Sequence, residues 1–162
     1  MDPGAEQEYS RRGESTAERL DRNYNELLQE LRVAQAGVQI LFAFLLSLAF
    51  TQRFGQANSF QRTTYVVTLL FAAGAAALLI APVAFHRIVF RQRQKDDLVD
   101  ASNRLALGGL GMLLVAMVGA VLLILDVVLG GSRALLLTAA VAAWFVGFWV
   151  VLPLTRRERP AN

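Results

Sequence analysis

Residues 31–50 read LRVAQAGVQILFAFLLSLAF, an apolar stretch that carries Arg32, Gln35 and Gln39 on its leading turns. From Val33 to Phe50 the apolar run is 18 residues long. A helix of about 20 apolar residues crosses the hydrocarbon core of a bilayer. This stretch therefore has the length of a membrane span, and its polar residues lie where the span would begin.

Three further apolar runs follow along the chain, at Tyr65–Phe85, Leu105–Leu129 and Ala134–Leu154. The sequence is 55% hydrophobic and 18% charged, and almost all of its charges lie between these runs. Such segregation is typical of a protein that crosses a membrane several times. Backbone groups in lipid must be hydrogen-bonded within their own element. The sequence therefore predicts an all-α membrane protein with four transmembrane helices.

The distribution of Lys and Arg predicts the orientation of these helices. The segment before the first run, the loop between the second and third runs, and the C-terminal tail hold 13 of the 16 Lys and Arg residues. Such residues concentrate in cytoplasmic segments. We therefore expect a multi-pass protein of the plasma membrane, with both termini and the 86–104 loop in the cytoplasm.

The segments outside the membrane differ in character. Residues 1–14 are polar and contain Pro and Gly, so we expect a disordered cytoplasmic tail, and residues 156–162 form a second cytoplasmic tail. Residues 15–32 open with a capping-box pattern, and apolar residues recur at helical spacing, at Leu20, Tyr24, Leu27, Leu28 and Leu31.

This pattern predicts a cytoplasmic amphipathic helix that continues without Gly or Pro into the membrane domain, residues 33–155. Helices that lie on a membrane surface usually carry a basic polar face. The polar face of this helix mixes acids and arginines, which favours packing on protein over packing on lipid.

Arg32, Gln35 and Gln39 continue the polar face of this helix into the first span. Gln39 lies seven residues beyond Arg32, about 10 Å at 1.5 Å per residue. Its amide needs a partner at that depth, because polar groups within the membrane face the bundle interior. Two interpretations remain open: hydrogen bonding between helices, or the cytoplasmic mouth of a polar pathway.

Asp126 is the only acid within a predicted span, and acids inside membranes are often functional. It reaches the outer interface, pairs with Arg133 across the intervening glycine turn, or binds a proton or cation. His86 lies at the cytoplasmic edge of the second span, where it titrates or simply marks the boundary. The residues of a candidate polar pathway are thus Gln35, Gln39, Asp126 and His86.

A cluster of basic residues lies beside the membrane on the predicted cytoplasmic side. We expect it to set the topology and to contact anionic lipids or a partner, and its members are Arg32, Arg87, Arg91, Arg93 and Lys95. Because the arginines flank apolar runs, nucleic acid is not an expected partner. Small residues four apart on the later spans allow close helix approach, within the bundle or between copies of the chain in a homo-oligomer.

The residue inventory argues against several chemistries. The chain has no Cys and one His, so we expect no thiol chemistry and no metal site. It contains no nucleophile–base constellation and no glycine-rich phosphate loop after a strand. We therefore expect no enzymatic activity and no cofactor.

Two segments, ERLDRNYNELLQELRVAQAGVQILFAFLLSLAF (18–50) and PVAFHRIVFRQRQKDDLVDASNRLAL (82–107), resemble an uncharacterised family of small four-span actinobacterial membrane proteins. Some members carry an automatically assigned sodium:proton antiporter label, and the resemblance implies that activity for this chain. Together with the polar face of the first span, it favours cation or proton translocation by an oligomer. The alternative is a non-transporting scaffold or regulatory subunit that binds a partner through the N-terminal amphipathic helix.

Overall fold

The computed structural model describes residues 16–89 and 95–157 of the chain. Within these ranges, only the backbone is described for residues 16–21, 23–25, 27, 85–89, 95–101 and 156–157. The predicted disordered tail at 1–14 lies outside the described residues. So do Arg91 and Arg93, and the side chains of His86, Arg87 and Lys95 are likewise not described.

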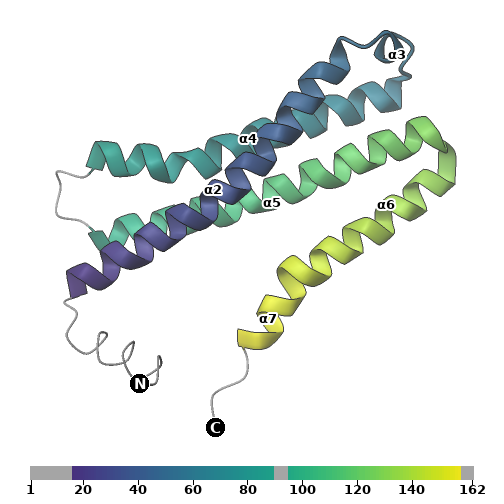
Figure 1. The fold of residues 1–162 in the computed structure, drawn as a ribbon. Coiled ribbons are helices and arrows are strands. Elements are labelled where there is room, and N and C mark those ends of the chain that lie inside the picture. Colours follow the sequence, from purple (N-terminus) through teal and green to yellow (C-terminus); the bar gives the residue numbers. More distant parts are fainter. Residues whose placement is uncertain (1–15, 90–94, 158–162) are drawn as a thin grey trace, which may run out of the picture.

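The described residues are helical and contain no strand, which confirms the all-α class (Figure 1). Four long helices are joined by short connections, and the fourth changes its winding near its end. In chain order the elements are α2 (Thr16–Ala49), α3 (Gln52–Gly55), α4 (Ser59–Val89), α5 (Lys95–Val128), α6 (Gly131–Val146), the π-helix η1 (Gly147–Val151) and α7 (Leu152–Arg157).

Helix α2 is 34 residues long and runs without a break from the predicted cytoplasmic segment into the first apolar run. The predicted continuity of the helix is therefore confirmed. The amphipathic character of residues 15–32 stays a prediction, because most of the side chains in this range are not described. Arg22 and Glu26 form an i, i+4 ion pair at 3.8 Å, and both side chains are largely exposed. Such a pair contributes little to stability.

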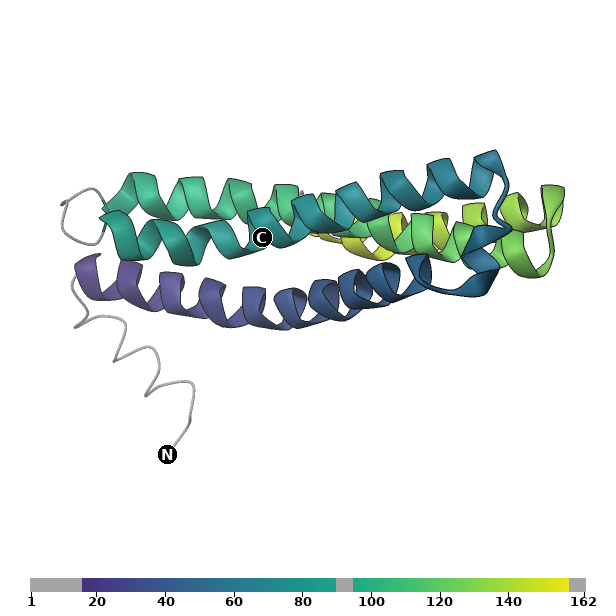
Figure 2. The same ribbon diagram turned by 90° about the horizontal axis from the view of Figure 1, so that it is seen from above.

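Helices α2, α4 and α5 form a three-helix core (Figure 2). On α2, Leu31, Val38 and Leu45 are seven residues apart and fully or almost fully buried. That spacing keeps one seam of a helix against its neighbours. The buried residues form two apolar clusters, one around Leu79 and the other around Tyr65. Together these clusters fill the space between the three helices along the length of the bundle.

Glycines let α4 and α5 approach closely. A Cβ at Gly109 of α5 would lie 2.8 Å from Leu79 Cγ of α4, closer than real atoms pack. Gly119 of α5 is similarly close to Thr68, and Gly74 of α4 to Met112. Small residues at a helix contact are the usual means of close packing in membranes. The pair α4–α5 is therefore the tightest contact of the fold.

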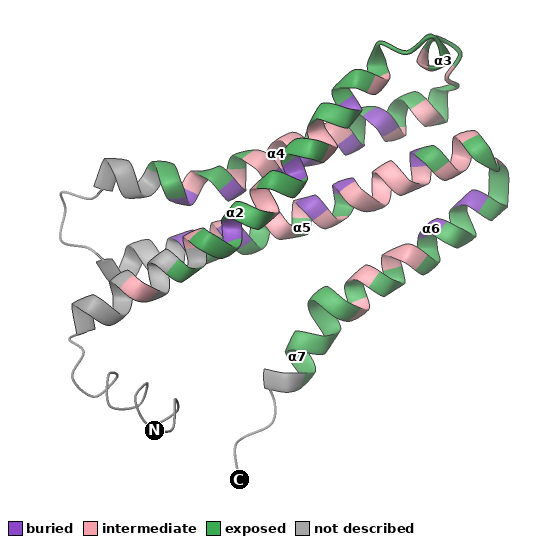
Figure 3. Cartoon of the chain, in the orientation of Figure 1, coloured by how far each residue is buried: buried purple, intermediate pink, exposed green. Residues whose placement is uncertain are grey.

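Helix α6 packs on α5, and only its Ala134 and Thr138 are buried (Figure 3). It is joined to α5 by a turn in which Gly130 and Gly131 both have positive φ, a conformation that other residues adopt only with strain. The sequence predicted one helix over residues 134–154. The structure instead widens into the π-helix η1 directly before Pro153, which lacks the N–H that would bond the Trp149 carbonyl.

Within residues 16–89 and 95–157, four helices are long and apolar enough to cross a membrane: Leu28–Ala49, Ser59–Ala84, Ser102–Val128 and Gly131–Thr155. Large apolar side chains point outward along them, with Val33 77%, Leu136 71% and Trp144 70% exposed. A soluble monomer rarely exposes such an extensive apolar surface, whereas lipid chains cover it without cost. The chain therefore has the architecture of a small membrane protein.

Candidate functional site

The end of the bundle at residues 50–58 and 129–131, here called the loop end, holds the best-organised polar groups among the described residues. Arg62 donates to the carbonyls of Ala57 and Gly55, at 3.0 and 3.2 Å, and so fixes the loop that follows α3. Phe54 of α3 packs on the Tyr65 ring, with centroids 4.6 Å apart. The Tyr65 hydroxyl in turn donates to the Leu45 carbonyl at 3.0 Å, which ties α4 to α2.

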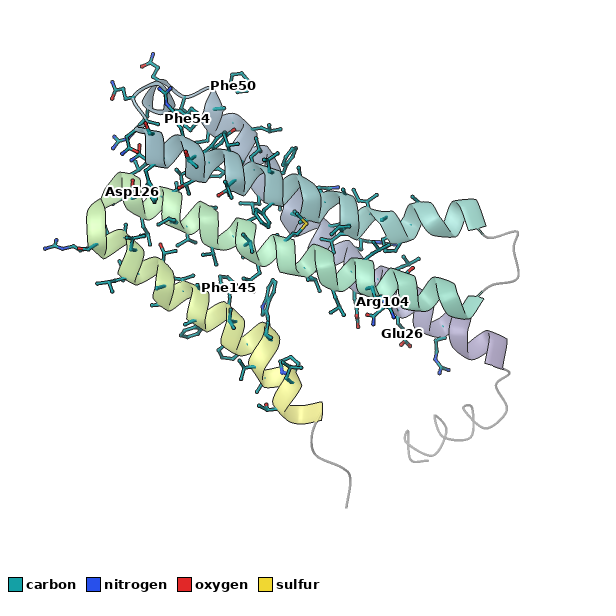
Figure 4. All side chains as sticks on the ribbon, turned by 180° about the vertical axis from the view of Figure 1, so that it is seen from behind. Glu26, Phe50, Phe54, Arg104, Asp126 and Phe145 are labelled. Carbon is teal, nitrogen blue, oxygen red and sulfur yellow. The ribbon has the colours of Figure 1, made fainter. Side chains whose placement is uncertain are left out.

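A reciprocal cap opens α4 and leads to the acid predicted as functional. The Gln61 backbone N–H donates to Asn58 Oδ1 at 2.9 Å, and the Asn58 backbone N–H donates to Gln61 Oε1 at 3.2 Å. The remaining donor of the same amide, Gln61 Nε2, reaches Asp126 Oδ2 on α5 at 2.9 Å. Gln61 thus holds the half-buried Asp126 carboxyl group at the loop end (Figure 4).

One of the alternatives for Asp126, its pairing with Arg133, is wrong. Arg133 is exposed and makes no ion pair or side-chain hydrogen bond within the part of the chain that the structure describes. The two positive-φ glycines turn the chain between these residues. The carboxyl group instead faces α4, where Gln61 supplies the donor.

A pocket of about 600 Å³ lies beside this pair. Its apolar wall comes from α2, α3 and α5 and includes Leu48, Phe54 and Leu123. Asn58 and Gln61 also line the pocket, but their side chains are already engaged in the reciprocal cap of α4. Arg53 also lines it and makes no side-chain bond among the described residues. The pocket is therefore an open, mainly apolar recess at the edge of the span.

We expect Gln61→Leu to lower the stability of the folded protein by about 1–3 kcal/mol, because Asp126 keeps its half-buried position and loses its donor. The same change removes Gln61 Oε1, the acceptor of the Asn58 backbone N–H in the reciprocal cap. Unfolding in mixed micelles of detergent and SDS measures the loss. Gln52→Leu, at an exposed position on α3, is the matched control and should change stability by less than about 0.5 kcal/mol. Equal losses in the two variants would contradict the role of Gln61.

Gln35 lies far from this site, in the other half of the bundle. Its Nε2 donates to the Leu79 carbonyl of α4 at 2.7 Å. Leu79 precedes Pro82 by three residues, and proline disturbs the backbone bonding of the preceding turn. A side chain from a neighbouring helix commonly satisfies carbonyls near such a proline. Gln35 therefore bonds two helices together.

Gln39 neither meets Gln35 nor faces the bundle interior. It is exposed on α2, and its side chain makes no hydrogen bond within the described residues. No other helix of the described chain covers it, so both interpretations of Gln39 stay predictions. Val38, its neighbour in sequence, takes the buried position instead. The candidate pathway residues with described side chains thus occupy three separate places.

The remaining predicted site residues add no described contact. Arg32 is exposed on α2, near the start of the candidate span. The side chains of His86, Arg87, Arg91, Arg93 and Lys95 lie outside those described. No group of three or more His, Cys, Asp or Glu side chains that could hold a metal occurs among the residues described.

The sequence interpretation missed Gln61. Its signal was present, because Asn58 followed three residues later by Gln61 is a capping-box pattern at the start of an apolar run. Nothing in the local sequence, however, connects Gln61 to Asp126, which lies 65 residues away.

Comparison with known proteins places these observations in a family. Neither a curated protein nor a solved structure matches the chain. A family model described as a family of unknown function (DUF6328) matches residues 13–153. These residues include the first three candidate spans in full and the fourth span up to Pro153. The chain therefore belongs to the DUF6328 family.

Proposed function

We propose that this protein acts by binding within and beside the membrane, as a non-transporting scaffold or regulatory subunit. The observation that supports this most strongly is the apolar filling between α2, α4 and α5. One cluster joins Leu31, Val38 and Leu79, and the other joins Leu45 and Leu123. An ion that crosses a bilayer needs polar groups or water along its path. Among the described residues, these clusters fill most of the middle of the three-helix core with apolar side chains, and Thr68 and Ser102 are the fully buried polar residues beside them.

The polar side chains of the candidate pathway support the same function. Gln35 is engaged by a backbone carbonyl and Asp126 by Gln61, in opposite halves of the bundle. Both contacts join helices to one another. Such contacts stabilise a fixed arrangement of helices, which is what a binding scaffold requires.

The surface proposed for the partner is the part of α2 before the span together with the first turn of the span. The helix begins at Thr16 and the candidate span at Leu28, so about 18 Å of helix precede the span at 1.5 Å per residue. Glu26 is exposed before the span, and Gln29 and Glu30 are exposed on its first turn. The charge bias assigns this end to the cytoplasm. A partner with a basic surface fits these acids.

The test reverses the two acids. We expect the full-length protein, cross-linked in membranes of its source organism, to recover one partner in a constant ratio. The double variant Glu26→Lys and Glu30→Lys should lower that recovery at least tenfold. Asn103→Lys, an exposed change on α5 near the same end, is the control and should leave recovery unchanged. Quantitative mass spectrometry measures the ratio, and unchanged recovery in the double variant would contradict the proposal.

A second candidate function is cation or proton translocation by an oligomer. Asp126 supports it, as an acid that lies within a candidate span and is held in place by Gln61. Since the chain's own core is apolar, the path would run between copies. In that case Asp126→Asn abolishes flux while the protein stays folded.

A further inference from the structure

Gln39 lies near the middle of the candidate span Leu28–Ala49 and on the outer surface of α2. Eleven residues separate it from Leu28, about 16 Å of a span that is about 33 Å long. Its amide carries two donors and an acceptor, and none of them is bonded within the described residues. Hydrocarbon offers an amide no hydrogen bond, so a single copy in lipid leaves this group unsatisfied.

Small and polar side chains line one side of α2 around Gln39, with the exposed Ile40 at their edge. Ala36 lies three residues before Gln39, Ala43 lies four residues after it, and Ser47 lies four residues after Ala43. At this helical spacing the four residues share one side of the helix. All of them are exposed, and a Cβ at the adjacent Gly37 would meet no atom within 4 Å. Ser47 returns its hydroxyl to the Ala43 carbonyl at 2.9 Å, which leaves Gln39 as the unsatisfied group.

This face, here called the Gln39 face and defined as Ala36, Gln39, Ala43 and Ser47, points away from the core. The buried seam of α2 at Leu31, Val38 and Leu45 lies on the other side of the helix. Small residues permit two helix backbones to approach closely, and a polar group between them hydrogen-bonds across the contact. The face thus has the two properties of a helix–helix interface, and nothing in the described chain covers it.

We propose that the Gln39 face binds the same face of a second copy of this chain, in a parallel two-fold dimer. Two copies inserted with the same topology carry Gln39 at the same depth. The amide is its own complement, because the N–H of each copy can donate to the carbonyl oxygen of the other. A two-fold contact pairs each patch with itself. Dimerisation through this face is independent of whether the protein binds a partner or moves ions.

Arg32 is compatible with this dimer. It lies on the same side of α2, seven residues from Gln39 and near the end of the span. A long basic side chain near a helix end extends to the headgroups and stays hydrated. The two guanidinium groups are then separated by water and anionic lipid.

Single cysteines test the geometry, since the natural chain contains none. Ala36→Cys and Ala43→Cys variants of the full chain in lipid vesicles should form disulfide-linked dimers under mild oxidation. Leu70→Cys is the control, on the 63% exposed surface of α4 within its span. It should form several-fold fewer dimers. Equal cross-linking at all three positions, or none on the Gln39 face, would overturn the proposal.

The role of the amide is tested separately by energy transfer between labelled copies in vesicles of increasing lipid content. Gln39→Leu should raise the dimer dissociation constant about 3- to 30-fold, the range expected for one hydrogen-bonded contact in a membrane. Ile40→Leu, at an adjacent and 73% exposed position, should leave it unchanged. A monomer at every lipid ratio, or a dimer that Gln39→Leu does not weaken, would refute the amide pair.

Discussion

Replacing Gly109 with leucine is expected to separate α4 from α5 and to lower stability by about 1–3 kcal/mol, the usual cost of overpacking a well-filled core. A Cβ at this position would already lie 2.8 Å from Leu79 Cγ and 3.3 Å from Leu78 Cβ. Leu79 is completely buried, so its side chain has no free volume into which to move. The added side chain must therefore push the two helices apart.

The control for this prediction lies two residues further along the same helix. Gly111 is exposed, and a Cβ there would meet nothing within 4 Å. Gly111→Leu has the same change in volume and helix propensity, and it should be neutral or slightly stabilising. SDS-induced unfolding of both variants in mixed micelles measures the difference. A Gly109→Leu variant as stable as Gly111→Leu would show that the α4–α5 contact is looser than described.

Leu45→Ala is expected to lower stability by about 2 kcal/mol, at the low end of the range for leucine truncation in a core. Leu45 is fully buried between α2 and α4 and belongs to the cluster that includes Tyr65 and Ala72. Lipid chains are as apolar as leucine, so the transfer of Leu45 out of lipid contributes little. The loss comes from the cavity that the shorter side chain leaves.

Leu46→Ala is the matched control, because Leu46 is the next residue and is 42% exposed on the outer surface. Lipid fills the space that this truncation opens, so the change should cost less than about 0.5 kcal/mol. The same unfolding assay compares the two variants. If Leu46→Ala cost as much as Leu45→Ala, the face of α2 that packs on the core would have been assigned wrongly.

The sequence predicted the helical class well because it depends on local properties. The four runs were apolar, long enough to span, and separated by charge, and each property can be read without knowing how the helices meet. The continuity of α2 followed from the absence of Gly and Pro between Gly13 and Gly37. These features follow from the covalent chain and its solvent, so they need no tertiary information.

The contacts between helices could not be predicted in the same way. Two possible partners for Asp126 lie in the sequence: the amide donor of Gln61 and the cation of Arg133. Which of them Asp126 meets depends on how α5 is rotated against α4, and the structure pairs it with Gln61. Gln35 and Gln39 lie four residues apart and looked like one polar stripe. The packing of α2 places Gln35 against Leu79 and leaves Gln39 outside. A rotation of a few tens of degrees decides such outcomes, and the polar pattern alone does not fix it.

Helix α6 illustrates the same point with apolar residues. Ala139, Ala143 and Gly147 have the four-residue spacing of a close helix contact. In the structure Ala139 and Ala143 are exposed, while Ala134 and Thr138 meet α5. On α4 and α5, by contrast, Ala72 and Ala116 lie in the core, while Ala77 is exposed. Spacing predicts that a face allows close approach, but it does not identify the neighbour.

Ion flux into vesicles that contain the purified full-length protein tests most directly whether the core is closed to ions. Gradients of H⁺, Na⁺ and K⁺ are imposed in turn, and a pH-sensitive dye and a membrane-potential dye report the movement. We predict flux equal to that of protein-free vesicles for every gradient, in the wild type and in Asp126→Asn alike. Flux above that background which Asp126→Asn abolishes, in a variant that stays folded, would contradict the binding function and establish translocation.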